Sequence, residues 1–144
     1  MVIRRRLLPA LREELSALAP TIADMIGLPQ RPFRLEWAPR GSTSAAYTYA
    51  DQGSIYLNRA WFRAHPDDYG CLAHEYTHLL QAVPGGTCPA EVIEGFADSV
   101  RYLLGLYDRT WWTPSEIASR IASLPPPDYQ RLSQAMAAGR YSSL

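Results

Sequence analysis

Apolar residues at helical spacing mark the beginning of the chain. They recur every three or four positions, the period that turns one face of a helix toward a core. These residues are Leu7, Leu8, Leu11, Leu15, Leu18, Ile22, Met25 and Ile26. Because Pro20 interrupts the series, the pattern predicts one helix over residues 5–18 and a second over residues 20–26, closed by Gly27.

Segments with strand character follow. Alternating apolar and polar residues predict a strand within residues 31–37. Residues 45–50 and 54–57 are two further strand candidates, and the Asp-Gln-Gly sequence at residues 51–53 is typical of a hairpin turn. The pattern therefore predicts a small sheet in this part of the chain.

The second half of the chain has helix signals. Pro66 and the two aspartates after it are typical of a helix start and predict a helix over residues 66–82. Further helices are predicted over residues 89–104, 113–123 and 127–138.

These elements predict the α+β class and a single domain over residues 1–144. Its parts are a helical segment (1–27), a small sheet (31–57), two central helices (66–105) and C-terminal helices (113–138).

The sequence His74-Glu75-Tyr76-Thr77-His78 matches the pattern H-E-x-x-H. Residues four apart lie on one helix face, so both imidazoles can bind one metal ion such as Zn²⁺. Glu75 is rotated by roughly 100° from His74 and flanks the open side of the metal, where a general base for a metal-bound water stands. The alternative is an ordinary helix whose histidines pack or cap, but the motif arises by chance in well under ~1% of chains this long.

A catalytic zinc ion needs a third protein ligand. Glu94 lies on the next predicted helix, and an antiparallel return after the glycine turn would bring it to the metal. Asp98 is four residues further on the same face and could accept the other ring N–H of a ligating histidine. Gly95 would let the two helices approach closely. Glu91 is the rival ligand, although a capping role explains it adequately.

Other reactive or aromatic residues have simpler interpretations. His65 is expected to be structural, at a helix entry. Cys71 and Cys88 are expected to be free buried thiols rather than a disulfide. Trp111 and Trp112 are expected to pack in the core rather than line a substrate pocket.

Composition narrows the possible partners. The chain has 14 acidic and 14 basic residues, a net charge of zero, which argues against nucleic acid as a partner. No apolar run approaches the roughly 18 residues of a membrane span. Arg4, Arg5 and Arg6 are not followed by the apolar region of a secretory signal. We therefore expect a cytoplasmic protein, or a secreted one if the chain is a processed form.

Two segments, HEYTHLLQ at residues 74–81 and IEGFADSVR at residues 93–101, resemble the basic secretory protein peptidases. More broadly, they are similar to the glutamate-type zincins (gluzincins), including the collagenase-like HEYTH…EG pattern. The resemblance covers residues 45–105 and implies a zincin-like domain with an edge strand near residues 54–57 beside the cleft. It also implies that Glu94 is the third zinc ligand and that Asp98 steadies the first histidine. Sites of this type often have a tyrosine or histidine that hydrogen-bonds an oxyanion, and the tyrosine candidates are Tyr102, Tyr107, Tyr129 and Tyr141. Ser99 departs from the family, which usually has an aromatic residue there.

Together these residues predict a zinc-dependent endopeptidase. His74, His78 and Glu94 would hold the zinc ion, and Glu75 would act as general base and then as general acid in peptide hydrolysis. A peptide or protein substrate would bind extended along the edge strand. Two alternatives stay open: a cytoplasmic regulatory protease with one dedicated protein substrate, and a metal-bound but inactive peptidase-like binding module.

Overall fold

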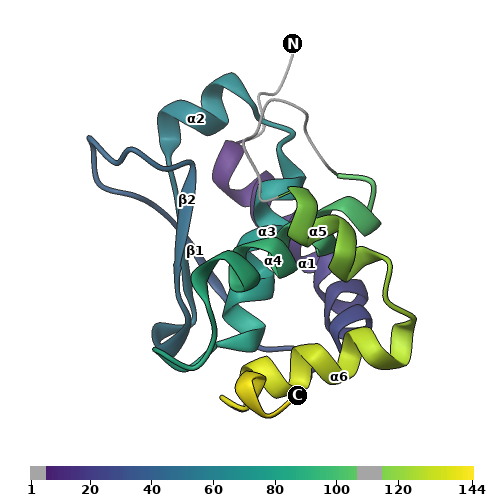
Figure 1. The fold of residues 1–144 in the computed structure, drawn as a ribbon. Coiled ribbons are helices and arrows are strands. Elements are labelled where there is room, and N and C mark those ends of the chain that lie inside the picture. The colour runs from purple at the N-terminus through teal and green to yellow at the C-terminus, as the bar shows by residue number, and fades with distance from the viewer. Residues whose placement is uncertain (1–5, 107–114) are drawn as a thin grey trace.

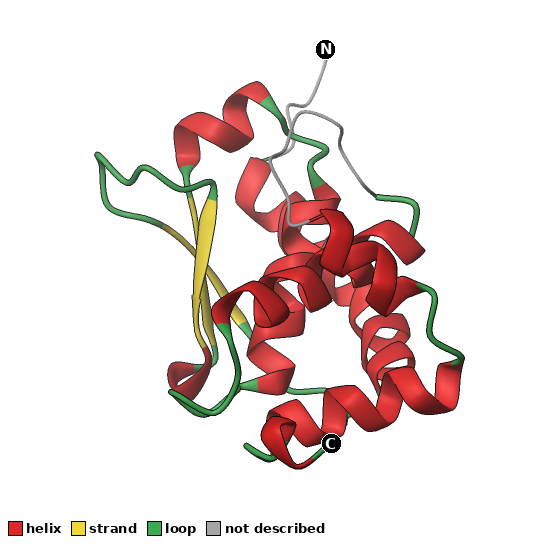
Figure 2. Cartoon of the chain, in the orientation of Figure 1, coloured by secondary structure: helices red, strands yellow, loops and turns green. Residues whose placement is uncertain are grey.

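A computed structural model of the chain describes residues 6–106 and 115–144. The strands form a sheet on one side of a group of helices (Figures 1 and 2). The described elements are α1 (Leu7–Ile26), β1 (Arg34–Trp37), β2 (Ala46–Tyr49), a 3₁₀ turn (Ala50–Gln52), β3 (Ser54–Leu57), α2 (Arg59–Ala64), α3 (Tyr69–Gln81), α4 (Ala90–Leu103), α5 (Ser115–Ala122), α6 (Pro126–Ala137) and a 3₁₀ turn (Tyr141–Ser143). The predicted α+β class is confirmed.

Helix α1 is continuous, so the prediction of two helices separated at Pro20 is wrong. Proline removes the hydrogen bond that an N–H at this position would donate to the carbonyl of Ser16, at a local cost of about 3 kcal/mol. The apolar face nevertheless keeps its phase across the proline, and Leu15 and Ile22 on either side are fully buried. Burial of this face therefore outweighs the local cost. Gly27 ends the helix in the left-handed region (φ 69°), as predicted.

The sheet has the strand order β1-β3-β2. β2 and β3 form the predicted antiparallel hairpin, with Gly53 in the left-handed region (φ 64°) in its turn, and β1 adds to β3 in parallel. The expectation that residues 54–57 form an edge strand is therefore wrong. β3 lies in the centre, with Ile55 and Leu57 fully buried, and β2 is the edge strand that packs on α3.

Helix α3 begins at Tyr69, so the start predicted at Pro66 is wrong. Asp68 is the N-cap, because its carboxylate accepts a hydrogen bond from the N–H of Cys71 at 3.2 Å. The same carboxylate accepts a hydrogen bond from the indole N–H of Trp61 at 2.9 Å. Trp61 belongs to α2, a short helix that the sequence analysis did not predict. The cap thus fixes α3 to the element before it.

Most of α3 is buried, because α1, α4, α6 and β2 all pack against it. Leu72, Ala73, Tyr76 and Leu79 are fully inaccessible to solvent. Burial of several large apolar side chains, each worth about 1.5–3 kcal/mol, holds this helix in one position. The residues of the H-E-x-x-H motif are therefore carried by the most enclosed helix of the fold (Figure 1).

A buried ion pair joins the start of α3 to the end of α4. The guanidinium of Arg101 donates a hydrogen bond to the capping carboxylate of Asp68 at 3.2 Å, and both side chains are almost fully buried. Gly70 lies against this pair, since a Cβ there would stand 2.2 Å from the carbonyl oxygen of Leu106 and 2.5 Å from Nε of Arg101. A side chain at this position has no room without a backbone shift.

The last three helices lie near their predicted positions, at α4, α5 and α6. The predicted helix start at Thr113 and Pro114 lies outside the described residues, as do Tyr107, Trp111 and Trp112. Over residues 6–106 and 115–144, no helix has both the length and the apolar character that a membrane crossing requires.

Gly70→Ala is expected to destabilise the protein by about 1–3 kcal/mol, because the added methyl group overpacks the junction of α3 and α4. Gly85→Ala is the matched control, since a Cβ at Gly85 meets no atom within 4 Å. Urea denaturation followed by circular dichroism measures both free energies of unfolding. Equal stability of the two variants would contradict the close approach at Gly70.

Candidate metal centre

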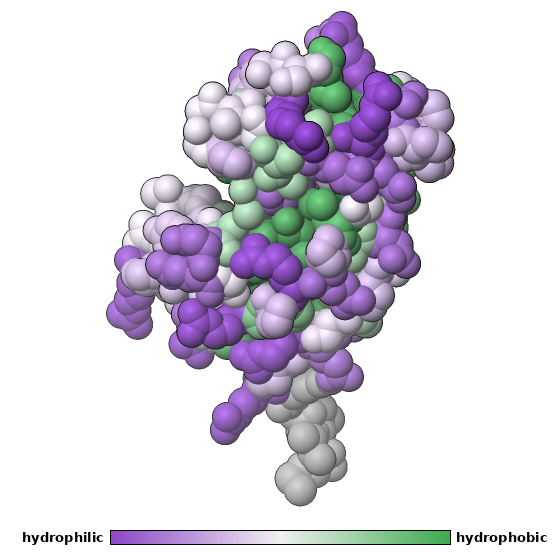
Figure 3. Space-filling view, turned by 90° about the horizontal axis from the view of Figure 1, so that it is seen from below, coloured by the Kyte–Doolittle hydropathy of each residue, from purple (hydrophilic) through white to green (hydrophobic). Residues whose placement is uncertain are grey.

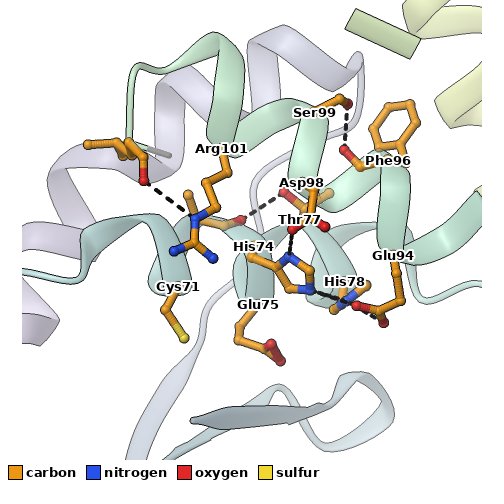
Figure 4. Close-up of polar contacts among 12 residues, drawn as sticks. Cys71, His74, Glu75, Thr77, His78, Glu94, Phe96, Asp98, Ser99 and Arg101 are labelled. Atoms are coloured by element: carbon orange, nitrogen blue, oxygen red, sulfur yellow. Dashed lines mark hydrogen bonds and ion pairs between the residues drawn. The ribbon is translucent and has the colours of Figure 1, made fainter. Parts of the chain in front are cut away.

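The two histidines of the motif lie on one face of α3, as their spacing predicts. The Nε2 atoms of His74 and His78 are 3.0 Å apart, and the two rings stand nearly perpendicular, at 85°. Both side chains are about 15% exposed, with values of 14% and 16%. Their Nε2 atoms therefore converge on one point (Figure 4), and both side chains are partly exposed to solvent.

Helix α4 brings Glu94 to the same point. Its Oε2 lies 2.9 Å from Nε2 of His74, and its Oε1 lies 3.2 Å from Nε2 of His78. The chain reverses between the helices after Ala82, whose left-handed conformation (φ 43°) ends α3. Glu91, the rival ligand of the sequence analysis, is exposed in the first turn of α4. The structure thus joins Glu94, and not Glu91, to the two histidines by direct contacts.

The geometry of these atoms fits a zinc ion. Tetrahedral zinc with bonds of about 2.0–2.1 Å keeps neighbouring ligand atoms about 3.3–3.4 Å apart. The observed separations of 3.0, 2.9 and 3.2 Å lie slightly below that value, so a small outward movement would admit the ion. Two imidazoles and one carboxylate are also a donor set of catalytic zinc sites.

Glu75 is a second carboxylate near the histidines. One ligand atom from each of His74, Glu75 and His78 lies within 4.8 Å of the others, so these three could also hold a metal. Glu94 is the better candidate for the third ligand, because it contacts both imidazoles directly. Oε1 of Glu75 instead accepts a hydrogen bond from the hydroxyl of Thr48 at 3.0 Å. Glu75 therefore lies beside the three groups that contact one another.

Asp98 orients the first histidine. Its Oδ1 lies 2.8 Å from Nδ1 of His74, and its side chain is 5% exposed. Because an ionised carboxylate can only accept hydrogen bonds, Nδ1 must carry the proton. In the neutral imidazole this leaves the lone pair on Nε2, the atom that faces His78 and Glu94. The geometry is the one expected of a residue that fixes the tautomer of a metal ligand.

The electrostatics reflect a concentration of negative charge around His74. Burial alone would lower the pKa of His74, but hydrogen bonds with Asp98 and Glu94 and the nearby charge of Glu75 raise it to about 10. Burial opposes ionisation of Glu94, yet hydrogen bonds with His74 and His78 lower its pKa well below the usual range. Without a metal ion, a proton on His74 therefore neutralises part of this charge.

Thr48 is a site residue that the sequence analysis missed. It lies on the edge strand β2, and its hydroxyl is shared between the carboxylate and the backbone carbonyl of Glu75, at 3.0 and 3.2 Å. Side chains alternate between the two faces of a strand, so Thr48 lies on the face opposite its two tyrosine neighbours. This alternation was the one indication of its position in the sequence. The element that would hold it against α3 could not be read from local sequence.

The two cysteines, His65 and Gly95 also had expected roles. Cys71 and Cys88 are both free, as expected, but only Cys71 is buried, and Cys88 is partly exposed. Burial raises the pKa of both thiols. His65 follows α2 and stacks on Trp61, away from the metal ligands, which agrees with a structural role. The role expected of Gly95 is wrong, because a Cβ there would meet Ile117 of α5 at 2.4 Å and not α3.

The tyrosine candidates fall into different environments. The hydroxyl of Tyr129 lies 2.9 Å from Oγ of Ser99 inside the core, and burial raises its pKa, so it does not face the ligand set. Tyr102 is 61% exposed, and Tyr141 packs partly against the core. Tyr107 lies outside the described residues.

A hollow of about 440 Å³ opens beside His78. It is lined by residues of β2, of the 3₁₀ turn after β2, of the loop after α3 and of α4. These are Thr48, Tyr49, Ala50, Asp51, Ala82, Val83 and Ile93. In the view from below, the molecule has hydrophobic surface bordered by hydrophilic side chains (Figure 3). His78 therefore borders a space large enough for an amino-acid side chain.

Comparison with known proteins supports the resemblance found in the sequence. Residues 52–122 match the model of a family described as peptidase of plants and bacteria. This finding confirms the resemblance to the basic secretory protein peptidases, and the matched segment contains all of the candidate metal ligands, Glu75 and Asp98. No curated protein and no solved structure matches the chain significantly. The family supports peptidase activity in general.

Glu94→Ala is expected to weaken zinc binding much more than Glu91→Ala, because only Glu94 contacts both imidazoles. Competition with a chromogenic chelator measures the two dissociation constants, and elemental analysis of protein purified without added metal identifies the bound ion. A larger loss in Glu91→Ala would move the third ligand to that residue.

Zinc affinity is expected to rise about tenfold for each pH unit between pH 7 and about 8.5, because binding must displace one proton from His74. The sign follows from the pKa of about 10, since His74 is protonated throughout this range in the metal-free protein. Asp98→Asn removes a charge that holds this proton, so its slope should be smaller, and its affinity should fall roughly 10–100-fold. A pH-independent affinity of the unaltered protein would contradict a protonated His74.

Proposed function

We propose that this chain, whose residues 52–122 match a family of peptidases of plants and bacteria, is a zinc-dependent endopeptidase. The observation that carries the proposal is the meeting of Nε2 of His74, Nε2 of His78 and the carboxylate of Glu94 within 3.2 Å of one another. Asp98 behind the first histidine and Glu75 beside the set complete the groups that such a peptidase needs.

His74, His78 and Glu94 would hold the zinc ion. When bound, zinc would supply Lewis acidity, which makes a water molecule more acidic and stabilises negative charge on a carbonyl oxygen. Asp98 keeps His74 in the tautomer that presents its lone pair. Since α3 is enclosed by the core, the two imidazoles keep their relative position while substrate binds.

Glu75 is the proposed general base. The residue is 6% exposed, and the hydroxyl of Thr48 donates a hydrogen bond to its Oε1. It would accept the proton of the attacking water and then donate it to the amine of the departing peptide, so one residue serves both proton transfers. Thr48 acts as a positioning residue, because it touches Glu75 and is carried by the strand next to which substrate would lie.

The substrate is proposed to bind in an extended conformation along β2. In the described part of the chain, β2 pairs only with β3, which leaves its other edge open for backbone hydrogen bonds with a peptide. The residues of the 3₁₀ turn after β2 and Ile93 of α4 border the adjacent hollow. A side chain of the peptide could enter this hollow while its backbone passes the histidines.

Glu75→Gln separates a peptidase from a metal-bound binding module. The amide keeps the shape of the side chain and an oxygen that accepts from Thr48, so fold and zinc content should stay unchanged. It cannot accept a proton at neutral pH, so cleavage should fall by about 10²–10⁴-fold or more. Digestion of a mixed peptide library, read by mass spectrometry, compares the variant with the unaltered protein.

Glu91→Gln is the matched control, because it makes the same chemical change on an exposed residue of α4. It should cleave at the rate of the unaltered protein. Undiminished cleavage by zinc-loaded Glu75→Gln would refute the role of Glu75. Complete absence of cleavage by the zinc-loaded, unaltered protein on peptides and on folded proteins would favour the binding module.

A further inference from the structure

Two hollows adjoin each other on another part of the surface. One, of about 490 Å³, lies between the segment after β1 and α2, and the other, of about 590 Å³, lies between α2 and the start of α1. Trp37, Arg59 and Arg63 line both, so they form one groove with Trp37 at its middle. We call it the arginine groove, defined by Arg6, Arg12, Trp37, Arg40, Arg59 and Arg63.

The charged residues that line this groove are all positive. Five arginines line it, and its lining among the described residues includes no aspartate or glutamate. The chain as a whole has a net charge of zero and contains no lysine, so its positive charge is entirely guanidinium. Guanidinium groups are planar and pair with carboxylates through two parallel hydrogen bonds, which a lysine ammonium cannot do. The groove is therefore suited to planar anions.

The groove also has apolar walls. Leu7, Leu8 and Pro9 of α1 line the larger hollow together with Trp37. The guanidinium of Arg59 lies 5.5 Å from the centroid of the Trp37 ring, a cation–π contact that holds it beside the ring. Guanidinium groups and apolar side chains therefore lie next to one another in the groove.

We propose that the arginine groove binds an acidic segment of a protein partner, in which aspartate or glutamate residues alternate with apolar ones. The carboxylates would pair with the arginines on both sides of Trp37, and the apolar side chains would contact the walls from α1. Hollows of this size receive individual side chains, whereas a flat lipid surface would contact only their rims. The phosphates of a nucleic acid would use the arginines but leave the leucine wall unfilled.

This binding site is distinct from the candidate metal centre. None of the residues that define the groove lines the hollow beside His78. The proposal therefore does not depend on peptidase activity, and a partner could occupy the groove while the metal centre remains open.

The test measures fluorescence anisotropy of a short fluorescein-labelled peptide with alternating glutamate and leucine, and of its counterpart with glutamine in place of glutamate. Mass spectrometry confirms that both peptides stay intact. The full chain should bind the glutamate peptide at least about tenfold more tightly than the glutamine peptide, and added salt should reduce the difference. Equal binding of the two peptides would overturn the proposal.

Charge reversal locates the site. Arg59→Glu combined with Arg63→Glu should weaken binding of the glutamate peptide at least about tenfold. Arg131→Glu combined with Arg140→Glu makes the same change in net charge at exposed positions in and after α6, and should change binding less than about twofold. An equal loss in both double variants would show a general charge effect and overturn the proposed site.

Two further measurements keep the outcome decisive. If circular dichroism shows that the double variant is unfolded, Arg40→Glu replaces it, because Arg40 lies outside the described helices. Unchanged peptide binding by Arg40→Glu would then overturn the proposal. Labelled single-stranded DNA and vesicles containing phosphatidylserine are assayed in parallel. Tighter binding of either one than of the peptide, with the same dependence on Arg59 and Arg63, would assign the groove to that class of partner instead.

Discussion

The antiparallel contact between α3 and α4 is the constraint on which the rest of the structure depends. Glu94 and Asp98 of α4 meet His74 in the middle of α3 (Figure 4). Arg101, near the end of α4, meets Asp68 at the start of α3. A shift of one helix by a turn would separate the buried Asp98 and Arg101 from their partners, and an unpaired buried charge costs about 3–5 kcal/mol. The arrangement that satisfies these charges is therefore also the one that brings the candidate ligands together.

Local periodicity accounts for what the sequence could predict. The spacing of His74 and His78 places both on one helix face, and the spacing of Glu94 and Asp98 does the same on the next helix. A glycine-containing turn between two helices made their antiparallel return a reasonable expectation, and the structure has it. The hairpin at residues 51–53 was likewise predictable, because its geometry depends on three neighbouring residues.

The wrong predictions concern features that depend on contacts with distant parts of the chain. Pro20 did not end α1, because the core beyond it buries the rest of the apolar face. β3 became the central strand only through pairing with β1, which no local signal announces. Ser99 also depends on a distant part of the chain, because its hydroxyl lies 2.9 Å from the hydroxyl of Tyr129 in α6.

The distribution of charge over the surface likewise depends on the tertiary fold. A net charge of zero gave no reason to expect an anion-binding surface, yet the fold gathers Arg12 of α1, Arg40 after β1 and Arg59 of α2 around Trp37. It also gathers acidic residues of α3 and α4 around the two histidines. Screening acts over about 8–10 Å at physiological salt, so each surface attracts its partners according to its own charge and not the total. Total charge therefore excludes a broad electrostatic footprint but says little about a groove built from a few arginines.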